Sequence, residues 1–516
     1  MKAVNMQGYY LGVDIGTFSS KGVLVQAASG EVAAQAEVEH GVESPKPGWA
    51  EHDADAVWWA DFVHITQKLL KQSGIQPEQI RCVGTSGLGA CTLPIGRDGS
   101  PLRKAILYGI DTRADEEIRE LEAALTPQGI FAVSGMKLSA QSTGPKMLWI
   151  KNHDPAVFKA TDCFLTSQAY LVYRLTRAKT LDYFTMGDYT PLVDIRANRW
   201  HPQNSALIIP LEKLPIPSWS CEMAGKVTAK AARESGLVEG TPVIVGSTDA
   251  GAETISTGAN RVGDLMVMFG SSCFFVLLTK TLKPSKQFWA TAWLDHSAHA
   301  LQAGTSTAGS LTRWFRDQFS PLEMQAQQEG GDAAYAALAH LLEESPPGAK
   351  GLVCLPYFEG ERTPIYDTQA KGVFFGLTLA HTRADVYRAM LEGTAYGIRH
   401  VIDSMREQGA APKRIIAAGG GTHNRGWMQA VCDIASIEMQ VLNTPSSAAY
   451  GDAFMAGVGI DDYKKLSDNA LWVKDMAQLR PNPANKSMYG QGYAVFRDLY
   501  KNTSGLMHAV DRMQKL

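Results

Sequence analysis

Short apolar runs that end in glycine and small polar residues stand out at two places along the chain. Residues 9–25 consist of an apolar strand, a Gly/Thr/Ser turn that carries Asp14 and a second apolar strand, so they predict a hairpin. Residues 241–276 repeat the pattern with an apolar strand that leads to Asp249, a short helix of small residues and another hairpin. The recurrence predicts a duplicated architecture with a boundary near residues 250–260 and a cleft between the two halves.

A helical pattern begins at Thr382. Thr382 and Asp385 have the spacing of a capping box, and apolar or small residues then recur at helical intervals through Gly393 and Gly397. Because glycine has no side chain, these two positions favour close packing of the helix rather than chemistry.

Composition and charge narrow the class of protein. The 516 residues include 49 basic and 52 acidic side chains, a near balance that gives no basic field to attract a nucleic acid. The apolar tract at residues 265–279 is shorter than the about 20 residues of a membrane-spanning helix. The seven cysteines are widely spaced, which favours reduced thiols, and the amino-terminal segment lacks a signal-peptide pattern. We therefore expect a cytoplasmic protein of two domains.

Asp14 is the first candidate for chemistry. It ends an apolar strand and is followed by Gly16, Thr17, Ser19 and Lys21. Backbone N–H groups of a glycine-containing turn bind anions, a carboxylate holds magnesium or its waters, and a lysine neutralises phosphate charge. The pattern is typical of a phosphate-binding hairpin, although an aspartate that bonds its own turn would explain Asp14 as well.

Asp249 is the candidate base. It follows an apolar strand, and its neighbours Gly246, Ser247, Ala250 and Gly251 are small enough to leave room for a ligand. A carboxylate that takes the proton of a hydroxyl while the oxygen attacks a γ-phosphate is a recurring arrangement in kinases. The alternative is a cap of the helix that begins at Ala250, and the two roles are compatible.

Two further glycine-rich segments favour nucleotide binding. Residues 304–314 and 417–433 place glycine and small polar residues before a helical pattern, and helix amino termini attract phosphate. The chain has no Walker motif, and its Gly419–Gly421 run is not a dinucleotide fingerprint, which argues against a P-loop kinase. The triple glycine alone is more typical of an ordinary turn than of a nucleotide site.

Together these segments resemble the FGGY carbohydrate kinases of the sugar kinase, heat-shock ATPase and actin-like superfamily. Residues 372–392 fit the longer family signature, and residues 143–153 resemble the shorter one, with Gln141 departing from its usual first residue. The resemblance implies an α/β fold of two actin-like (ribonuclease H-like) domains with an interdomain cleft. Residues 1–254 would form the sugar and phosphate side, and residues 255–516 the nucleotide side. It also implies an ATP-dependent sugar kinase that uses ATP and Mg²⁺.

The resemblance assigns roles to individual residues of this chain. Asp249 would be the general base and would hold magnesium together with Asp14, which would do so through water. The implied ATP contacts are Thr17, Ser19, Lys21, Gly270, Ser271, Gly304, Gly420 and Asn424. The implied substrate contacts are Gly87, Leu88, Gly89, Asp111, Arg113 and Asp249.

The acceptor segment departs from family members that act on xylulose. Those usually carry Ser-Gly-Gln-x-His-Gly, whereas this chain reads SGLGAC from Ser86 to Cys91, so the glutamine and histidine are missing. The Asn-Gln-Arg-Glu segment of glycerol kinases is absent too. Asp111 and Arg113 keep two residues of a further family segment, with a loop ion pair at the surface as the alternative. We expect xylulose as the acceptor, with another ketose, a sugar acid or an alditol still open.

The expected partner is a small sugar or polyol, with no nucleic acid and no membrane. The oligomeric state is open, and a homodimer is one assembly that fits. The rival class is a non-catalytic actin-like ATPase switch or a sugar sensor, which would share the ATP motifs but would not require a base such as Asp249.

Overall fold

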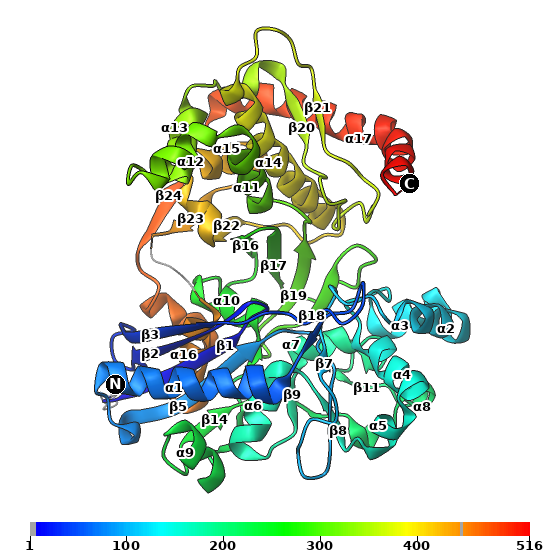
Figure 1. Cartoon of the computed structure of the whole chain (residues 1–516), viewed down its shortest axis with the longest axis vertical. Coiled ribbons are helices and arrows are strands. Elements are labelled where there is room, and N and C mark those ends of the chain that lie inside the picture. The colour runs from blue at the N-terminus through cyan, green and yellow to red at the C-terminus, as the bar shows by residue number, and fades with distance from the viewer. Residues whose placement is uncertain (1–6, 444–446, 516) are drawn as a thin grey trace. The chain divides into compact units, whose positions relative to one another are not determined.

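The chain forms two compact units in the computed structural model, which describes residues 7–443 and 447–515 (Figure 1). The first unit comprises Met1–Val262, Leu278–Ala300 and Ser446–Lys474, and the second comprises Gly263–Leu277, Leu301–Pro445 and Asp475–Leu516. Two segments of the first unit therefore lie beyond the boundary that the sequence places between residues 254 and 255.

The main sheet of the first unit has the strand order β13-β14-β5-β1-β2-β3. Its strands are β1 (Tyr9–Ile15), β2 (Ser19–Gln26), β3 (Val32–Glu39), β5 (Ile80–Gly87), β13 (Met223–Lys226) and β14 (Pro242–Ile244), and β15 (Ser247–Thr248) also pairs with β5. β1 and β2 form the predicted antiparallel hairpin, and β5 runs parallel to β1. The strand extends one residue past Asp14, which pairs with Lys21 and Ser86, so Asp14 lies at the strand end and not in the turn.

Helices and short strands complete the first unit. The helices are α1 (Ala60–Ser73), α2 (Asp115–Leu125), α3 (Pro127–Ser134), α4 (Thr143–His153), α5 (Pro155–Ala160), α6 (Ser167–Thr176), α7 (Tyr183–Met186), α8 (Pro202–Ile208), α9 (Ala229–Ser235), α10 (Asp249–Ser256) and α16 (Ala448–Gly459). The short strands are β4 (Glu51–His52), β6 (Leu93–Ile95), β7 (Ala105–Ile106), β8 (Cys163–Leu165), β9 (Thr180–Asp182), β10 (Val193–Asp194), β11 (Arg199–Trp200), β12 (Ile216–Ser218) and β18 (Trp289–Ala292).

The alternation of side chains along β1 explains why helices cover both faces of this sheet (Figure 1). Leu11 and Val13 belong to a core that includes Phe62 of α1. On the opposite face, Gly12 lies so close to α16 that an added Cβ would be 1.8 Å from the carbonyl oxygen of Ala449. Glycine at this position therefore sets how closely α16 approaches the sheet.

A second core of the first unit surrounds α4. Met147 and Ile150 of this helix belong to the same apolar cluster as Phe164, Leu181 and Tyr189. The helix spans the residues of the shorter family signature, Thr143–His153, so that motif folds as a buried helix.

The second unit repeats the arrangement of the first. Its sheet contains β17 (Cys273–Thr279), β16 (Asp264–Phe269), β22 (Arg414–Ala418), β23 (Met439–Leu442) and β24 (Met476–Leu479) in this order. β16 and β17 form an antiparallel hairpin, and β22 runs parallel to β16, as β5 does to β1. The structure thus confirms the hairpin predicted at residues 265–279 and the predicted repetition of the first unit's hairpin in the second unit.

The other elements of the second unit are mainly helical. They are β19 (His299–Gly304), which begins at the edge of the first unit, α11 (Gly309–Phe319), α12 (Pro321–Gln328), α13 (Ala334–Glu343), β20 (Val353–Leu355), β21 (Val373–Phe375), α14 (Arg383–Glu407), α15 (Arg425–Ala435) and α17 (Lys486–Gln514).

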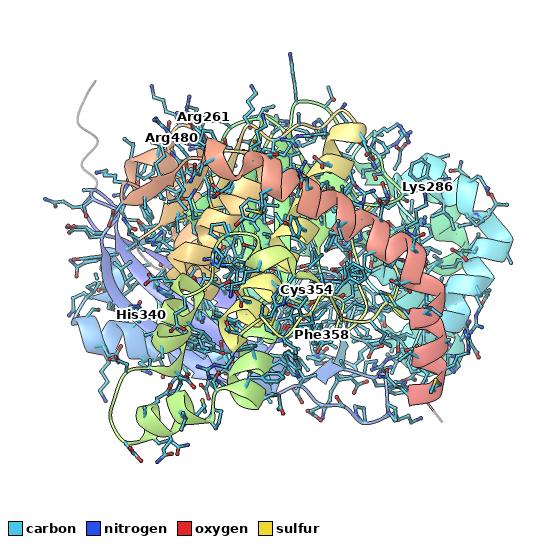
Figure 2. All side chains as sticks on the ribbon, turned by 90° about the horizontal axis from the view of Figure 1, so that it is seen from above. Arg261, Lys286, His340, Cys354, Phe358 and Arg480 are labelled. Atoms are coloured by element: carbon cyan, nitrogen blue, oxygen red, sulfur yellow. The ribbon has the colours of Figure 1, made fainter. Side chains whose placement is uncertain are left out.

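The long helix α14 begins with the predicted capping box of Thr382 and Asp385. Gly393 packs closely, since an added Cβ would be 2.5 Å from the carbonyl oxygen of Cys354, a residue that Figure 2 labels. For Gly397 the prediction of close packing is wrong, because an added Cβ would meet nothing within 4 Å.

Two further predictions concern the cysteines and the absence of a membrane-spanning helix. All seven cysteines are unpaired, as their spacing indicates. Among the described residues, no helix has both the length and the apolar character that crossing a membrane requires.

Candidate active site

Three carboxyl groups come together at the end of β1. The Ser86 hydroxyl lies 2.8 Å from Oδ1 of Asp14 and 2.7 Å from Oδ2 of Asp452, a residue of α16. A hydroxyl has one proton to donate, so the double contact requires a proton on one of the two carboxyl groups. Burial, followed by the charge of Asp14, raises the pKa of Asp452 well above its usual value, which places that proton on Asp452.

Asp249 joins this cluster at the first turn of α10. Burial, followed by the charge of Asp14, raises the pKa of Asp249 to about 7. Its Oδ1 accepts a 2.7 Å hydrogen bond from the Ala250 N–H, while Thr248 is the residue that caps the helix by accepting from Gly251. The alternative role of Asp249 as the cap is therefore wrong. A carboxylate with a pKa near neutrality suits the transfer of a hydroxyl proton.

The turn of the first hairpin is fixed by its own backbone and by a buried histidine. The Gly16 N–H donates to the Ser19 carbonyl at 3.0 Å. His40 contacts the Gly16 carbonyl at 3.1 Å through Nε2 and Asp61 at 2.8 Å through Nδ1. Ser20 donates to the same aspartate and is fully buried, so its hydroxyl does not face a ligand.

The predicted phosphate contacts of this turn have different surroundings. The Thr17 hydroxyl lies 3.0 Å from the Tyr108 hydroxyl, and Ser19 is half-buried at the start of β2. The Lys21 ammonium is half exposed and lies 3.6 Å from Glu37 of β3. Thr17 therefore connects the turn to the segment in which the sequence places the acceptor, whereas Lys21 lies in an exposed ion pair.

The predicted acceptor residues 87–89 follow directly from the strand that carries Ser86. Leu88 is buried, and Gly87 packs so tightly that an added Cβ would be 2.4 Å from the Ser167 hydroxyl oxygen. Gly89 faces a different group, because an added Cβ there would lie 3.1 Å from Oδ2 of Asp188. The missing side chain at position 89 thus lets a carboxylate approach the backbone of the acceptor segment closely.

Asp111 and Arg113 form a buried ion pair, which corrects the alternative of a surface pair. Both side chains have no exposed area, and Nη2 of Arg113 lies 2.7 Å from Oδ2 of Asp111. Arg113 also bonds Glu51 at 2.7 Å, and its guanidinium lies 3.9 Å from the ring centroid of Trp49. Asp111 accepts from the Ala50 N–H at 2.6 Å. The pair holds two loops together, and its contact with substrate stays a prediction.

Lys146 of α4 is buried beside this pair. Its ammonium donates to the carbonyl oxygens of Leu107 and Tyr108 at 2.6 and 2.8 Å. Burial lowers the pKa of Lys146 to about 8, and the charge of Asp111 opposes that shift. The lysine of the shorter family signature therefore anchors the strand end that leads to Tyr108.

The second unit contains a pocket of about 610 Å³, a size typical of small-ligand sites. Of the predicted ATP contacts, Gly270, Ser271, Gly420 and Asn424 line it. Gly304 does not, because the Arg362 guanidinium covers it at 2.9 Å from the position of an added Cβ. The remaining lining residues are Phe269, Gly309, Thr312, Arg313, Tyr335, Ala336, Ala339, Tyr387, Gly421, His423 and Trp427.

The polar end of this pocket is the turn between β16 and β17. The N–H groups of Gly309 and Ser310 donate to carbonyl oxygens of Gly270 and Ser271, both at 3.0 Å, so the first turn of α11 holds the hairpin. These two N–H groups already donate within the protein and are not free to bind a phosphate oxygen. Two cationic groups face the turn: Nη2 of Arg313 lies 3.2 Å from the Ser271 hydroxyl, and Nη2 of Arg362 lies 3.4 Å from the Ser272 hydroxyl.

The structure adds three polar groups that the sequence patterns missed. Asp452 lies within a helix of small residues, Asp188 in a short turn after α7, and Arg313 on the exposed face of α11. None has a local motif, because each reaches its site through the packing of a distant segment.

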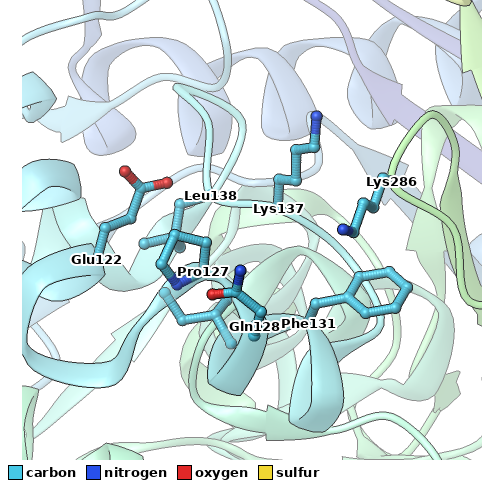
Figure 3. A pocket seen from close by; sticks show the side chains of 8 residues that line it. Glu122, Pro127, Gln128, Phe131, Lys137, Leu138 and Lys286 are labelled. Atoms are coloured by element: carbon cyan, nitrogen blue, oxygen red, sulfur yellow. The ribbon is translucent and has the colours of Figure 1, made fainter.

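A smaller pocket of the first unit, about 250 Å³, lies beside α2 and α3 (Figure 3). Lys137 and Lys286 line it together with Glu122 and Phe131. It shares no lining residue with the carboxyl cluster, so it is not part of the acceptor site.

The repeated hairpin sheets define a protein of the actin-like α/β class. The N-terminal domain of the FGGY family of carbohydrate kinases matches residues 9–255, and the C-terminal domain of that family matches residues 265–460. The chain therefore belongs to the FGGY family and is an ATP-dependent sugar kinase.

Individual relatives agree on the family and differ in the sugar named. A xylulose kinase of Bacillus subtilis (strain 168) is 26% identical over 98% of this chain and 99% of its own length. A gluconokinase of the same strain is 25% identical over 90% of each chain. The crystal structure of xylulose kinase from Rhodospirillum rubrum, 31% identical, superposes with a TM-score of 0.87 over 97% of this chain and 100% of that one.

Proposed function

We propose that this kinase transfers the γ-phosphate of ATP to a primary hydroxyl of a small ketose, with D-xylulose as the first candidate. The observation that carries the proposal is Asp249, a partly buried carboxyl at a helix start whose pKa is raised to about 7. Relatives named xylulose kinase at 26% and 31% identity support the choice of sugar.

In this proposal Asp249 takes the proton of the attacking hydroxyl. The hydroxyl oxygen forms a bond to the γ-phosphorus, the bond to the β,γ-bridging oxygen breaks, and ADP leaves. The neighbour Ala250 is small and only partly buried, which suits an acceptor next to the carboxylate. Gly251 does not add room, because an added Cβ there would be 2.9 Å from Cδ2 of Leu294. The Ala250 N–H holds Oδ1, so Oδ2 is the oxygen available to the substrate.

The second unit would bind the nucleotide. The apolar walls formed by Tyr335, Ala336 and Ala339 suit a base, while the turn at Ser271 and the guanidinium of Arg313 suit phosphate oxygens. Reaction requires the acceptor oxygen and the γ-phosphorus to approach within about 3–3.5 Å.

The carboxyl cluster fits magnesium held together with phosphate. Among the described residues no three acidic, histidine or cysteine side chains are arranged as a protein-only metal site. Kinase magnesium is instead bound by one or two carboxylates, waters and substrate phosphates. Ser86 occupies Oδ1 of Asp14 and leaves Oδ2 for water or metal, so Asp14, with Asp249 nearby, would hold the ion. When bound, Mg²⁺ neutralises charge on the transferring phosphoryl group.

The residues at positions 88 and 90, Leu88 and Ala90, are compatible with acceptors other than xylulose. They replace the glutamine and histidine expected of xylulose kinases, so hydroxyl discrimination must come from other residues.

A coupled ADP assay with D-xylulose, ribulose, erythritol, glycerol and gluconate tests the proposal. We expect ADP formation to depend on an added acceptor and to be fastest, by kcat/KM, with a ketose. ATP binding without stimulation by any acceptor of the panel would contradict the proposal and favour a switch or sensor.

A further inference from the structure

The carboxylate of Asp188 lies against the acceptor segment. Asp188 belongs to a 3₁₀ turn, Gly187–Tyr189, directly after α7. The position of a Cβ on Gly89 would be 3.1 Å from Oδ2 of Asp188 and 2.9 Å from Cγ2 of Thr248, the residue before the candidate base. Asp188 therefore lies against the Gly89 backbone of the acceptor segment, close enough to Asp249 for their charges to interact.

The backbone around Asp188 is held firmly. Gly187 packs so closely on Thr291 of β18 that an added Cβ would be 2.2 Å from Cγ2 of that threonine. The Asp188 carbonyl oxygen accepts from the Thr143 hydroxyl at 3.4 Å, at the start of α4. The backbone position from which the Asp188 side chain projects is thus set by packing on two elements.

Within residues 7–443 and 447–515, no group donates a hydrogen bond to the Asp188 carboxylate or forms an ion pair with it. Asp182, six positions earlier, is different: it accepts from the Thr185 N–H at 3.1 Å and from the Ser247 hydroxyl at 2.8 Å. The Asp188 side chain is only partly buried, so its unbonded oxygens are acceptor sites available to a ligand.

The charges that face Asp188 are mainly negative. Asp182 of β9 and Asp249 of α10 act on it as like charges, and Lys146 of α4 is the opposite charge. Two of the three ammonium protons of Lys146 are already bonded to backbone carbonyl oxygens. An anionic group placed here would meet repulsion, whereas hydroxyl groups would supply the missing donors.

We propose that Asp188 is a specificity-determining residue that accepts hydrogen bonds from acceptor hydroxyls and disfavours acceptors bearing a carboxylate. The substrate class is then an uncharged polyhydroxy compound, a ketose or an alditol, rather than a sugar acid. This inference rests on the proposed function, because it assumes that the acceptor lies beside Asp249.

The test compares Asp188→Asn and Asp188→Ala with the wild-type chain at pH 8. The asparagine variant keeps the size and one acceptor oxygen, so the KM for the best neutral acceptor rises about tenfold, and the alanine variant raises it about 100-fold. The kcat changes less than about threefold, because Asp249 is intact. The ratio of kcat/KM for gluconate to that for the neutral acceptor rises at least about tenfold in Asp188→Asn.

Glu116→Gln is the matched control, since it removes one acidic charge from an exposed position of α2 in the same unit. It should leave every acceptor KM unchanged. Unchanged acceptor KM values and an unchanged gluconate ratio in Asp188→Asn would overturn the inference, as would a wild-type preference for gluconate. The latter result would leave the kinase function standing.

Acceptor binding measured by calorimetry distinguishes a failure of the proposed function from a failure of the role proposed for Asp188. If no compound of the panel stimulates ADP formation, the proposed function fails, but wild-type binding of a neutral sugar that Asp188→Ala weakens still supports the role of Asp188. Binding of neither neutral nor acidic acceptors overturns both proposals.

Discussion

Gly84 sets the distance between β5 and the helix that carries Asp452. A Cβ at position 84 would be 2.2 Å from the carbonyl oxygen of Asp452 and 2.8 Å from its carbonyl carbon. Both are backbone atoms, so α16 must retreat by about 1 Å or more to restore ordinary contact in Gly84→Ala. The same movement of α16 would break the hydrogen bond between Ser86 and Asp452, which is 2.7 Å long in the wild type.

We expect this substitution to destabilise the first unit by about 1–5 kcal/mol. Overpacking contributes about 1–3 kcal/mol and the lost hydrogen bond about 1–2 kcal/mol, while the reduced entropy of the unfolded chain returns less than about 1 kcal/mol. At about 2–4 °C per kcal/mol, the midpoint of thermal unfolding falls by roughly 2–20 °C.

Scanning fluorimetry of the full chain measures this midpoint. Gly41→Ala is the matched control in the same unit, because a Cβ at position 41 would meet nothing within 4 Å. A Gly84→Ala midpoint within about 2 °C of the control would refute the packing argument.

Three further predictions concern the ion pair, the nucleotide and pH. Asp111→Asn removes one of the two carboxylates that bond the buried Arg113 and leaves Glu51, so we expect a loss of about 1.5–3 kcal/mol in thermal or urea unfolding, and a change confined to acceptor KM would contradict this. Arg313→Gln should raise the KM for ATP about tenfold and leave the acceptor KM unchanged, since its guanidinium faces Ser271 at 3.2 Å. Burial, followed by the charge of Asp182, raises the pKa of Asp188 to about 7, so the folded state binds this proton more tightly than the unfolded chain does. The stabilisation from that proton is complete below pH about 4 and is lost as pH rises through about 7. The free energy of unfolding of Asp188→Asn, measured by urea titration, should therefore match that of the wild type at pH 4 and exceed it at pH 8 by about 1–3 kcal/mol after allowance for partial exposure.

Local patterns predicted the parts of the site that lie at strand ends. The apolar run before Asp14 and the one before Asp249 are short and end in small residues, so each strand and the group that follows it are readable from neighbouring positions. The hairpin at Gly270 and the capping box at Thr382 are local for the same reason.

The rest of the site depends on contacts that a single sequence does not reveal. Asp452 meets Ser86 across 366 positions, because the segment Ser446–Lys474 packs into the first unit. The other residues of its helix are mostly small and apolar. From the sequence alone, Asp452 would therefore be assigned to the solvent-facing side of that helix, whereas the structure buries it. The position of Asp188 in the site is hidden from the sequence for the same reason. It follows from the close approach of its carboxylate to Gly89 and not from the residues next to it in the chain.

The central claim is that Asp249 removes the proton of the acceptor hydroxyl, and Asp249→Asn tests it most directly. The measurement is acceptor-dependent ADP formation, with ATP binding followed in parallel by calorimetry. The account predicts a fall in kcat of about 10²–10⁴-fold with the dissociation constant for ATP unchanged within about threefold. Turnover within tenfold of the wild type, at the same bound fraction of ATP, would contradict the assignment of Asp249 as the base.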